Sequence, residues 1–166
     1  MPNCIGPFQE GFNMEKLVVT SPCFEDGALI PVEHTGYGAD RSPELLLNGL
    51  SREAVSVAII MNDMGHPIPA YNHWVIWNIP AMARIPGDIE HGGQVKTLHP
   101  AMQGIGYGKN RYKGPKPPFH WSHLYHFCVY TLDCFLDLPS STRKKDLLRA
   151  MQGHILQEAV LSGHYR

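Results

Sequence analysis

Residues 113–133, KGPKPPFHWSHLYHFCVYTLD, join a proline-rich block to a run of β-branched and aromatic residues. The prolines disfavour a helix over the histidines that follow, so a β-strand is predicted to begin near His123. Successive side chains of a strand point to opposite faces. One predicted face therefore carries His123, Tyr125, Phe127 and Val129. The other carries Leu124, His126, Cys128 and Tyr130.

Further apolar runs predict more strands. Residues 16–22 (KLVVTSP) and 27–35 (GALIPVEHT) are predicted to be early strands joined by a turn. Residues 54–63 (AVSVAIIMND) suit a strand buried on both faces, although periodicity alone does not distinguish it from a short helix. Residues 72–80 (NHWVIWNIP) form another strand that stops at Pro80.

The rest of the chain divides into a long loop and a predicted helix. Residues 81–118 are rich in glycine and proline and show little periodicity, which is typical of a pocket rim. Residues 140–163 are predicted to be helical, with an N-cap at Ser140 or Ser141, a break near Gly153 and an end at Gly163. The apolar stripe behind this prediction consists of Leu147, Leu148, Met151, Ile155 and Ala159.

Composition limits the function classes. The 166 residues fit one domain, 1–166, with 1–16 as an N-terminal extension. Only 17% of the residues are charged and the net charge is -1, which argues against nucleic acid and anionic membranes as partners. No signal peptide or membrane span is expected, so the chain is predicted to be cytoplasmic.

The four cysteines form no CxxC pair, so a zinc site made from cysteine pairs is not expected. They are Cys4, Cys23, Cys128 and Cys134. A chain of this length and apolar content does not need disulfides, and buried free thiols are the favoured interpretation. The sequence leaves a disulfide open.

Two aromatic-plus-histidine pairs begin predicted strands. His123 and Tyr125 share one face, and Tyr71 and His73 share a face that Val75 is predicted to continue inward. A metal site made from the closely spaced histidines of residues 120–126 is not expected, because those at 123 and 126 point apart. Any single histidine is more simply explained as a hydrogen-bonded core residue. Together with Asp63, the pairs predict a shared pocket.

Several segments together resemble the phosphatidylethanolamine-binding proteins, and in particular the bacterial Raf-kinase-inhibitor-like branch. They occur in the family's order and at about its spacing: SPCFEDGALIP (21–31), SPELLL (42–47), NDMGHP (62–67), NHWVIWNIP (72–80), YKGPKPP (112–118), HLYHFCVYTLD (123–133) and GHILQEAVLSGHYR (153–166). The resemblance covers residues 18–166. It implies a mainly β fold of two packed antiparallel sheets with a C-terminal helical segment. It also implies a small surface pocket for phosphate or a phosphoryl head group.

The resemblance also implies which residues bind the ligand. They are Asp63, Tyr71, His73, Gly114, Pro117, His123 and Tyr125. The family motif D-P-D-A-P reads DMGHP here, so Gly65 replaces the second acid and His66 lies beside the gap. Phe119 and Trp121 stand where the family has a glycine-bearing loop, and we expect them to narrow or extend the pocket mouth.

The sequence thus predicts a non-enzymatic binding protein for a small anionic or phosphorylated ligand, with no cofactor and no metal. Lys116 and the basic residues 109–113 are expected to steer the anion toward the pocket. The resemblance adds regulation of a partner protein and a homodimer as expectations. The alternative is an acid-base hydrolase that uses Asp63, His73 and His123. A zinc site formed by His66, His73 and His123 has the least support, since their spacings are not diagnostic.

Overall fold

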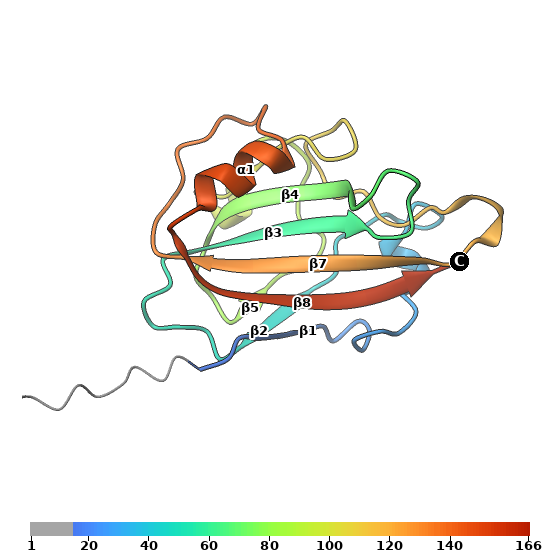
Figure 1. Cartoon of the computed structure of the whole chain (residues 1–166), viewed down its shortest axis with the longest axis horizontal. Helices are drawn as coiled ribbons and strands as arrows, with labels where there is room; N and C mark the ends of the chain where they lie inside the picture. Colours follow the sequence, from blue (N-terminus) through green and yellow to red (C-terminus); the bar gives the residue numbers. More distant parts are fainter. Residues whose placement is uncertain (1–14) are drawn as a thin grey trace, which may run out of the picture.

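The computed structural model describes residues 15–166, so Cys4 and almost all of the predicted N-terminal extension lie outside the described residues. Two antiparallel sheets make up the fold (Figure 1). The smaller sheet has the order β1 (Val18–Thr20), β2 (Leu45–Asn48), β5 (Arg84–Ile85). The larger has the order β6 (Met102–Gln103), β4 (Tyr71–Pro80), β3 (Ser56–Asp63), β7 (His123–Leu132), β8 (Ile155–Tyr165). The predicted fold class is confirmed.

Four short helices complete the described chain. The α-helix α1 spans Lys144–Met151 and lies on the face of the larger sheet that points away from the smaller sheet (Figure 1). The 3-10 helices are η1 (Val32–His34), η2 (Lys96–Leu98) and η3 (Pro118–His120). None of the helices in residues 15–166 is long and apolar enough to cross a membrane.

Strand β3 lies at the centre of the larger sheet and is covered on both faces. Ile59 and Met61 belong to the main core between the two sheets. Ala58 and Ile60 belong to a second core, in which residues of α1 cover the sheet. An antiparallel strand usually alternates between apolar and polar residues, but two buried faces explain why β3 is apolar almost throughout.

The alternation predicted for β7 is confirmed. Tyr125, Phe127 and Val129 lie in the main core, whereas Cys128 and Tyr130 pack against the second core. Every second residue from the start of the strand is buried, as the two-residue period of a strand requires.

The predicted orientation of Val75 in β4 is wrong. Met61 pairs with Trp74 and Asn62 pairs with Asn72, so His73 is an extra residue in a β-bulge. A bulge reverses the alternation beyond it. Trp74 therefore enters the main core, and Val75 enters the second core.

The strand predicted over residues 27–35 does not form. Leu29 makes one isolated parallel bridge to His164, and Val32–His34 is a 3-10 helix. Pro31 stands between these two features and has no N–H to donate to a sheet, which accounts for the interruption.

The predicted C-terminal helix is shorter than expected. It begins after the N-cap residue Arg143, not after a serine cap, and ends at Met151. Gly153 then adopts a left-handed conformation with φ of 81°, and the chain reverses into β8. Strand β8 pairs with β7 from Ile155 opposite Leu132 to Tyr165 opposite His123, with one irregularity at Leu156. The backbone hydrogen bonds to this distant strand outweigh the helical apolar spacing.

The described cysteines agree only in part with the predicted buried free thiols. Cys23, Cys128 and Cys134 are free thiols, but each is half-buried rather than fully buried.

Candidate functional site

A cleft of about 340 Å³ lies where β3 ends and β4 and β7 begin. Asp63, the last residue of β3, pairs with Tyr71 of β4 and with Tyr125 of β7, so the sheet register itself brings these strand ends together. The cleft is lined by Asp63, His66, His73, Tyr107, Lys113, Gly114, Lys116, Pro117, Pro118, His123 and Tyr125. Every residue of the predicted site except Tyr71 is in this set.

The Asp63 carboxylate orients His123. Nδ1 of His123 lies 2.8 Å from Oδ2 and 3.1 Å from Oδ1 of Asp63, and both side chains are buried. A carboxylate only accepts hydrogen bonds, so Nδ1–H of His123 is the donor. Nε2 is then the ring nitrogen available to a ligand.

His73 is held from the opposite side. Its Nδ1–H donates to the carbonyl oxygen of Lys113 at 2.7 Å, and its Nε2 lies 3.8 Å from Oδ2 of Asp63. Burial lowers the pKa of His73 below its ordinary value, and the bond to Lys113 and the Asp63 charge offset this only in part. His73 is therefore neutral at pH 8 and presents an unprotonated Nε2.

The Tyr125 hydroxyl is a buried donor without a hydrogen-bond partner among the described residues. The ring of His73 meets the Tyr125 ring edge-on at 5.5 Å. Burial, and after it the Asp63 carboxylate, raises the pKa of Tyr125, so the hydroxyl keeps its proton. Because this hydroxyl lines the cleft, it is a candidate donor to a ligand.

The proline-rich loop is held in place by hydrogen bonds to a distant segment. Gly114 N–H donates to Asp40 Oδ1 at 2.7 Å, and the Tyr37 hydroxyl donates to the Pro117 carbonyl at 2.7 Å. A Cβ on Gly114 would lie 2.2 Å from the His34 carbonyl oxygen. Gly114 thus permits a close backbone approach, and its own N–H is already engaged.

Two lysines give the cleft a positive rim. Lys113 lies 3.7 Å from Asp40, and Lys116 lies over the Tyr37 ring at 5.5 Å. Both belong to the basic residues that are predicted to steer an anion, and the structure places both in the lining of the cleft. Lys113 is held there by the hydrogen bond that its carbonyl accepts from His73.

Aromatic side chains pack against the cleft histidines. Tyr71, the predicted site residue that does not line the cleft, stacks on His66 with ring centroids 4.2 Å apart. Tyr107 meets the rings of Tyr71 and His73 at 5.4 and 5.0 Å. Sequence reasoning missed Tyr107, because a tyrosine in a glycine-rich loop gives no sign of packing against a strand more than thirty residues away.

Gly65 leaves no space for the acid that the family motif carries. A Cβ on Gly65 would lie 2.9 Å from Cγ of His123. Gly65 N–H also donates to Asp63 Oδ1 at 2.9 Å, which helps to hold the carboxylate against the histidine. The glycine therefore permits the close contact between this turn and His123.

We expect Gly65→Ala to weaken anion binding at least about tenfold, because the new methyl group must displace His123 from its position. Met64→Ala is the control for an alanine in the same turn, since Met64 is 43% exposed and does not line the cleft. Calorimetric titration with sulfate measures both variants. Unchanged affinity in Gly65→Ala would show that the position of His123 does not matter for binding.

Phe119 and Trp121 do not shape the described cleft as expected. Their side chains are 80% and 60% exposed, and neither lines it. Phe119 and His120 both have positive φ, which turns this loop outward.

The three cleft histidines do not form a group with metal-ligand spacing. Within residues 15–166, the one set of at least three histidine, cysteine or acidic side chains whose ligand atoms all lie within 4.8 Å is Asp133, Cys134 and His154. The zinc alternative based on His66, His73 and His123 thus gains no support from the geometry.

The sequence of this chain is similar to those of known proteins. Residues 20–166 match the family model for phosphatidylethanolamine-binding protein. A UPF0098 protein of Pyrococcus abyssi is 39% identical over 153 residues, covering 91% of this chain and 86% of the relative. A UPF0098 protein of Chlamydia muridarum is 34% identical, covering 89% of this chain and 97% of the relative. Relatives thus occur in archaea and bacteria, and the bacterial branch stays a prediction.

Solved structures agree. A phosphatidylethanolamine-binding protein homologue of Chlamydia trachomatis has a TM-score of 0.80 and 30% identity, covering 92% of this chain and 98% of that chain. YbcL of E. coli has a TM-score of 0.78 at 24% identity, covering 91% and 98%, and shows a shared fold.

Proposed function

The chain belongs to the phosphatidylethanolamine-binding protein family, and on that premise we propose that it is a non-enzymatic binding protein for a small anionic or phosphorylated ligand. The observation that carries the proposal is the buried, unpartnered hydroxyl of Tyr125 in the cleft between two histidines. The proposed ligand-binding residues are those that line the cleft, with Tyr71 as a support behind His66.

The hydrogen-bonding groups of the cleft support an oxyanion as the ligand. Tyr125 O–H is a donor, and Nε2 of His123 and Nε2 of His73 become donors when the rings are protonated. Hydrogen bonds to a charged acceptor contribute roughly 1.5–3 kcal/mol each. Asp63 accepts hydrogen bonds from His123 and Gly65, so its proposed role is to orient His123 rather than to contact the anion.

The charges around His73 decide how binding depends on pH. His73 faces Asp63 from β3, His66 from the turn after β3, and Lys113 from the loop. Its pKa lies below the ordinary value of about 6.5, so it is neutral at pH 8. An anion in the cleft stabilises the imidazolium, and binding then takes up a proton.

We therefore expect the affinity for sulfate to rise from pH 8 to pH 6, by up to about tenfold per pH unit for one linked proton. Sulfate is the primary probe because its charge is constant over this range, whereas a phosphate monoester titrates near pH 6. Calorimetric titrations of sulfate, phosphate, phosphotyrosine and phosphoethanolamine at both pH values measure the effect. His73→Gln should retain only the pH dependence that His123 contributes, so its affinity should rise less from pH 8 to pH 6 than that of the wild type.

His123→Ala should reduce the affinity for all four anions at least about tenfold. His126→Ala is the matched control, because His126 is a histidine of the same strand on the opposite face. Equal losses in the two variants, or no saturable binding to the wild type, would contradict the proposed anion site.

A second candidate function is acid-base hydrolysis by Asp63, His73 and His123. The specific observation in its favour is the Asp63–His123 contact of 2.8 Å, since a carboxylate-oriented histidine can serve as a general base. No serine, threonine or cysteine lines the described cleft, so water would be the nucleophile. Turnover of a phosphoester or acyl ester that disappears in His73→Ala would favour this function over binding alone.

We also propose that the cleft recognises a phosphorylated residue of a partner protein. Binding of the chain would then regulate the activity of that partner. A phosphopeptide that binds more tightly than free phosphotyrosine, in a manner lost in His123→Ala, supports this. The homodimer remains a prediction that sedimentation of the purified chain tests.

A further inference from the structure

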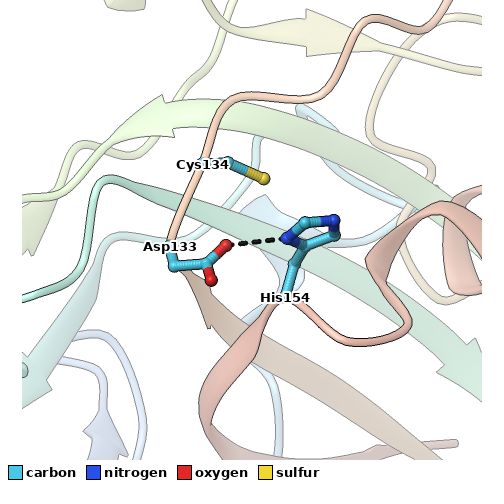
Figure 2. A group of neighbouring side chains, drawn as sticks. All are labelled: Asp133, Cys134 and His154. Carbon is cyan, nitrogen blue, oxygen red and sulfur yellow. Dashed lines mark hydrogen bonds and ion pairs between the residues drawn. The ribbon is translucent and has the colours of Figure 1, made fainter.

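A second cluster of reactive side chains lies at the far end of β7 from the cleft. His123 begins this strand at the cleft, and Asp133 and Cys134 follow its last residue, roughly 30 Å away. His154 lies directly before β8. The ligand atoms of Asp133, Cys134 and His154 all lie within 4.8 Å of one another, and Figure 2 shows the three side chains turned toward a common point.

The backbone holds this cluster in place before any ligand binds. Asp133 N–H donates to the His154 carbonyl at 3.1 Å, which ties the end of β7 to the start of β8. The buried Ser56 hydroxyl donates to the Cys134 carbonyl. Two residues further on, Asn78 makes both backbone bonds of Leu136, at 2.7 and 2.8 Å. The two ligand-bearing segments are thus anchored to each other and to the sheet.

The side chains are also partly preorganised. Nδ1 of His154 lies 2.8 Å from Oδ1 of Asp133, and both side chains are 45% exposed, so the cluster is open to solvent. Tetrahedral Zn²⁺ with ordinary bond lengths holds its ligand atoms roughly 3.3–3.6 Å apart. Side-chain rotations that move the donors by about 1 Å are therefore sufficient to close the site.

We propose that Asp133, Cys134 and His154 bind one Zn²⁺ ion, with water in the fourth position. The ion takes the place of the hydrogen bond between Asp133 and His154. The His154 ring keeps one proton, which moves through solvent to the nitrogen that does not bind the ion, and the Cys134 thiol releases its proton to solvent. One thiolate, one imidazole and one carboxylate suit Zn²⁺, whereas Mg²⁺ and Ca²⁺ prefer oxygen ligands alone. The ion would join the end of β7 to the turn before β8.

The same three residue types could instead form a cysteine nucleophile with its base. A nucleophilic cysteine needs a neighbouring base or cation that stabilises its thiolate. Nδ1 of His154 is hydrogen-bonded to Asp133 rather than to the Cys134 thiol, so the contacts of this cluster do not show a histidine acting as the base of that thiol.

Cobalt provides the test, because Co²⁺ replaces Zn²⁺ in tetrahedral sites and a thiolate ligand adds a near-ultraviolet charge-transfer band. The protein is purified without a histidine tag and stripped with a chelator. We expect one equivalent of Co²⁺ to produce that band and one equivalent of Zn²⁺ to abolish it. Zn²⁺ should also raise the Tm.

Four variants locate the ion. Cys134→Ser should lose the band and the rise in Tm, and His154→Gln and Asp133→Asn should weaken Zn²⁺ binding by about 10- to 100-fold or more. Cys128→Ser, a half-buried thiol of β7 outside the cluster, should retain both effects. Sulfate affinity should be unchanged in all four, so this test and that of the anion cleft fail independently.

The proposal is overturned if Co²⁺ produces no thiolate band, if the band persists in Cys134→Ser, or if it is lost in Cys128→Ser. Co²⁺ bound without that band would lie on histidines elsewhere, which also overturns it. Circular dichroism of each variant establishes that the fold is intact.

Discussion

Tyr125→Phe is expected to lower the affinity for sulfate and phosphate by roughly 10- to 150-fold and to leave the free energy of unfolding unchanged or higher. The lost hydrogen bond to a charged acceptor is worth about 1.5–3 kcal/mol in the complex. In the free protein the hydroxyl makes no hydrogen bond of ordinary length, so its removal costs at most a weak contact with the Asp63 carboxylate. Calorimetric titration and urea unfolding measure the two quantities.

The combination of the two results is what identifies a ligand-binding hydroxyl. Tyr130→Phe is the matched control, because Tyr130 lies on the opposite face of the same strand. This substitution should leave the affinity for sulfate unchanged. A different outcome would be a loss of more than about 1 kcal/mol in the free energy of unfolding of Tyr125→Phe, with unchanged affinity for sulfate. The hydroxyl would then have a structural role, and the proposed site would lose its principal support.

Phe127→Ala is expected to reduce the free energy of unfolding by about 3–5 kcal/mol. Phe127 is fully buried between the sheets, and its ring lies 6.1 Å from that of Phe24 and 6.5 Å from that of Tyr112. Truncation leaves a cavity among aromatic rings that are themselves buried in the main core and cannot fully close around it. Chemical denaturation followed by tryptophan fluorescence measures the loss.

Phe135→Ala is the control for removal of a phenylalanine. Phe135 is 48% exposed, and its truncation should change the free energy of unfolding by no more than about 0.5 kcal/mol. A loss in Phe127→Ala as small as that of the control would mean that the main core does not depend on β7.

The two substitutions separate the roles of one strand face. Tyr125 and Phe127 are two residues apart and point to the same side of β7. Tyr125 lines the cleft at the end of the larger sheet, whereas Phe127 lies in the main core between the two sheets. We therefore expect one substitution on this face to alter ligand affinity, at Tyr125, and another to alter the free energy of unfolding, at Phe127.

Local sequence determined the features that depend on neighbouring residues. The proline block before His123 and the β-branched run after it were sufficient to predict β7 and the alternation of its side chains. The continuous apolar run of β3 predicted burial on both faces. The family resemblance correctly predicted the fold class, and it selected six residues that line one cleft.

Tertiary structure decided the features that depend on contacts between distant segments. Residues 155–165 form a strand because β7 offers backbone partners along almost all of their length. Val75 points away from the predicted face because the pairing with β3 inserts a bulge at His73. The cleft acquired Tyr107 and Lys113, and Cys134 met His154, only through the arrangement of strands. Periodicity reports which face of an element is apolar; it carries no information on which other element covers that face or completes its hydrogen bonds.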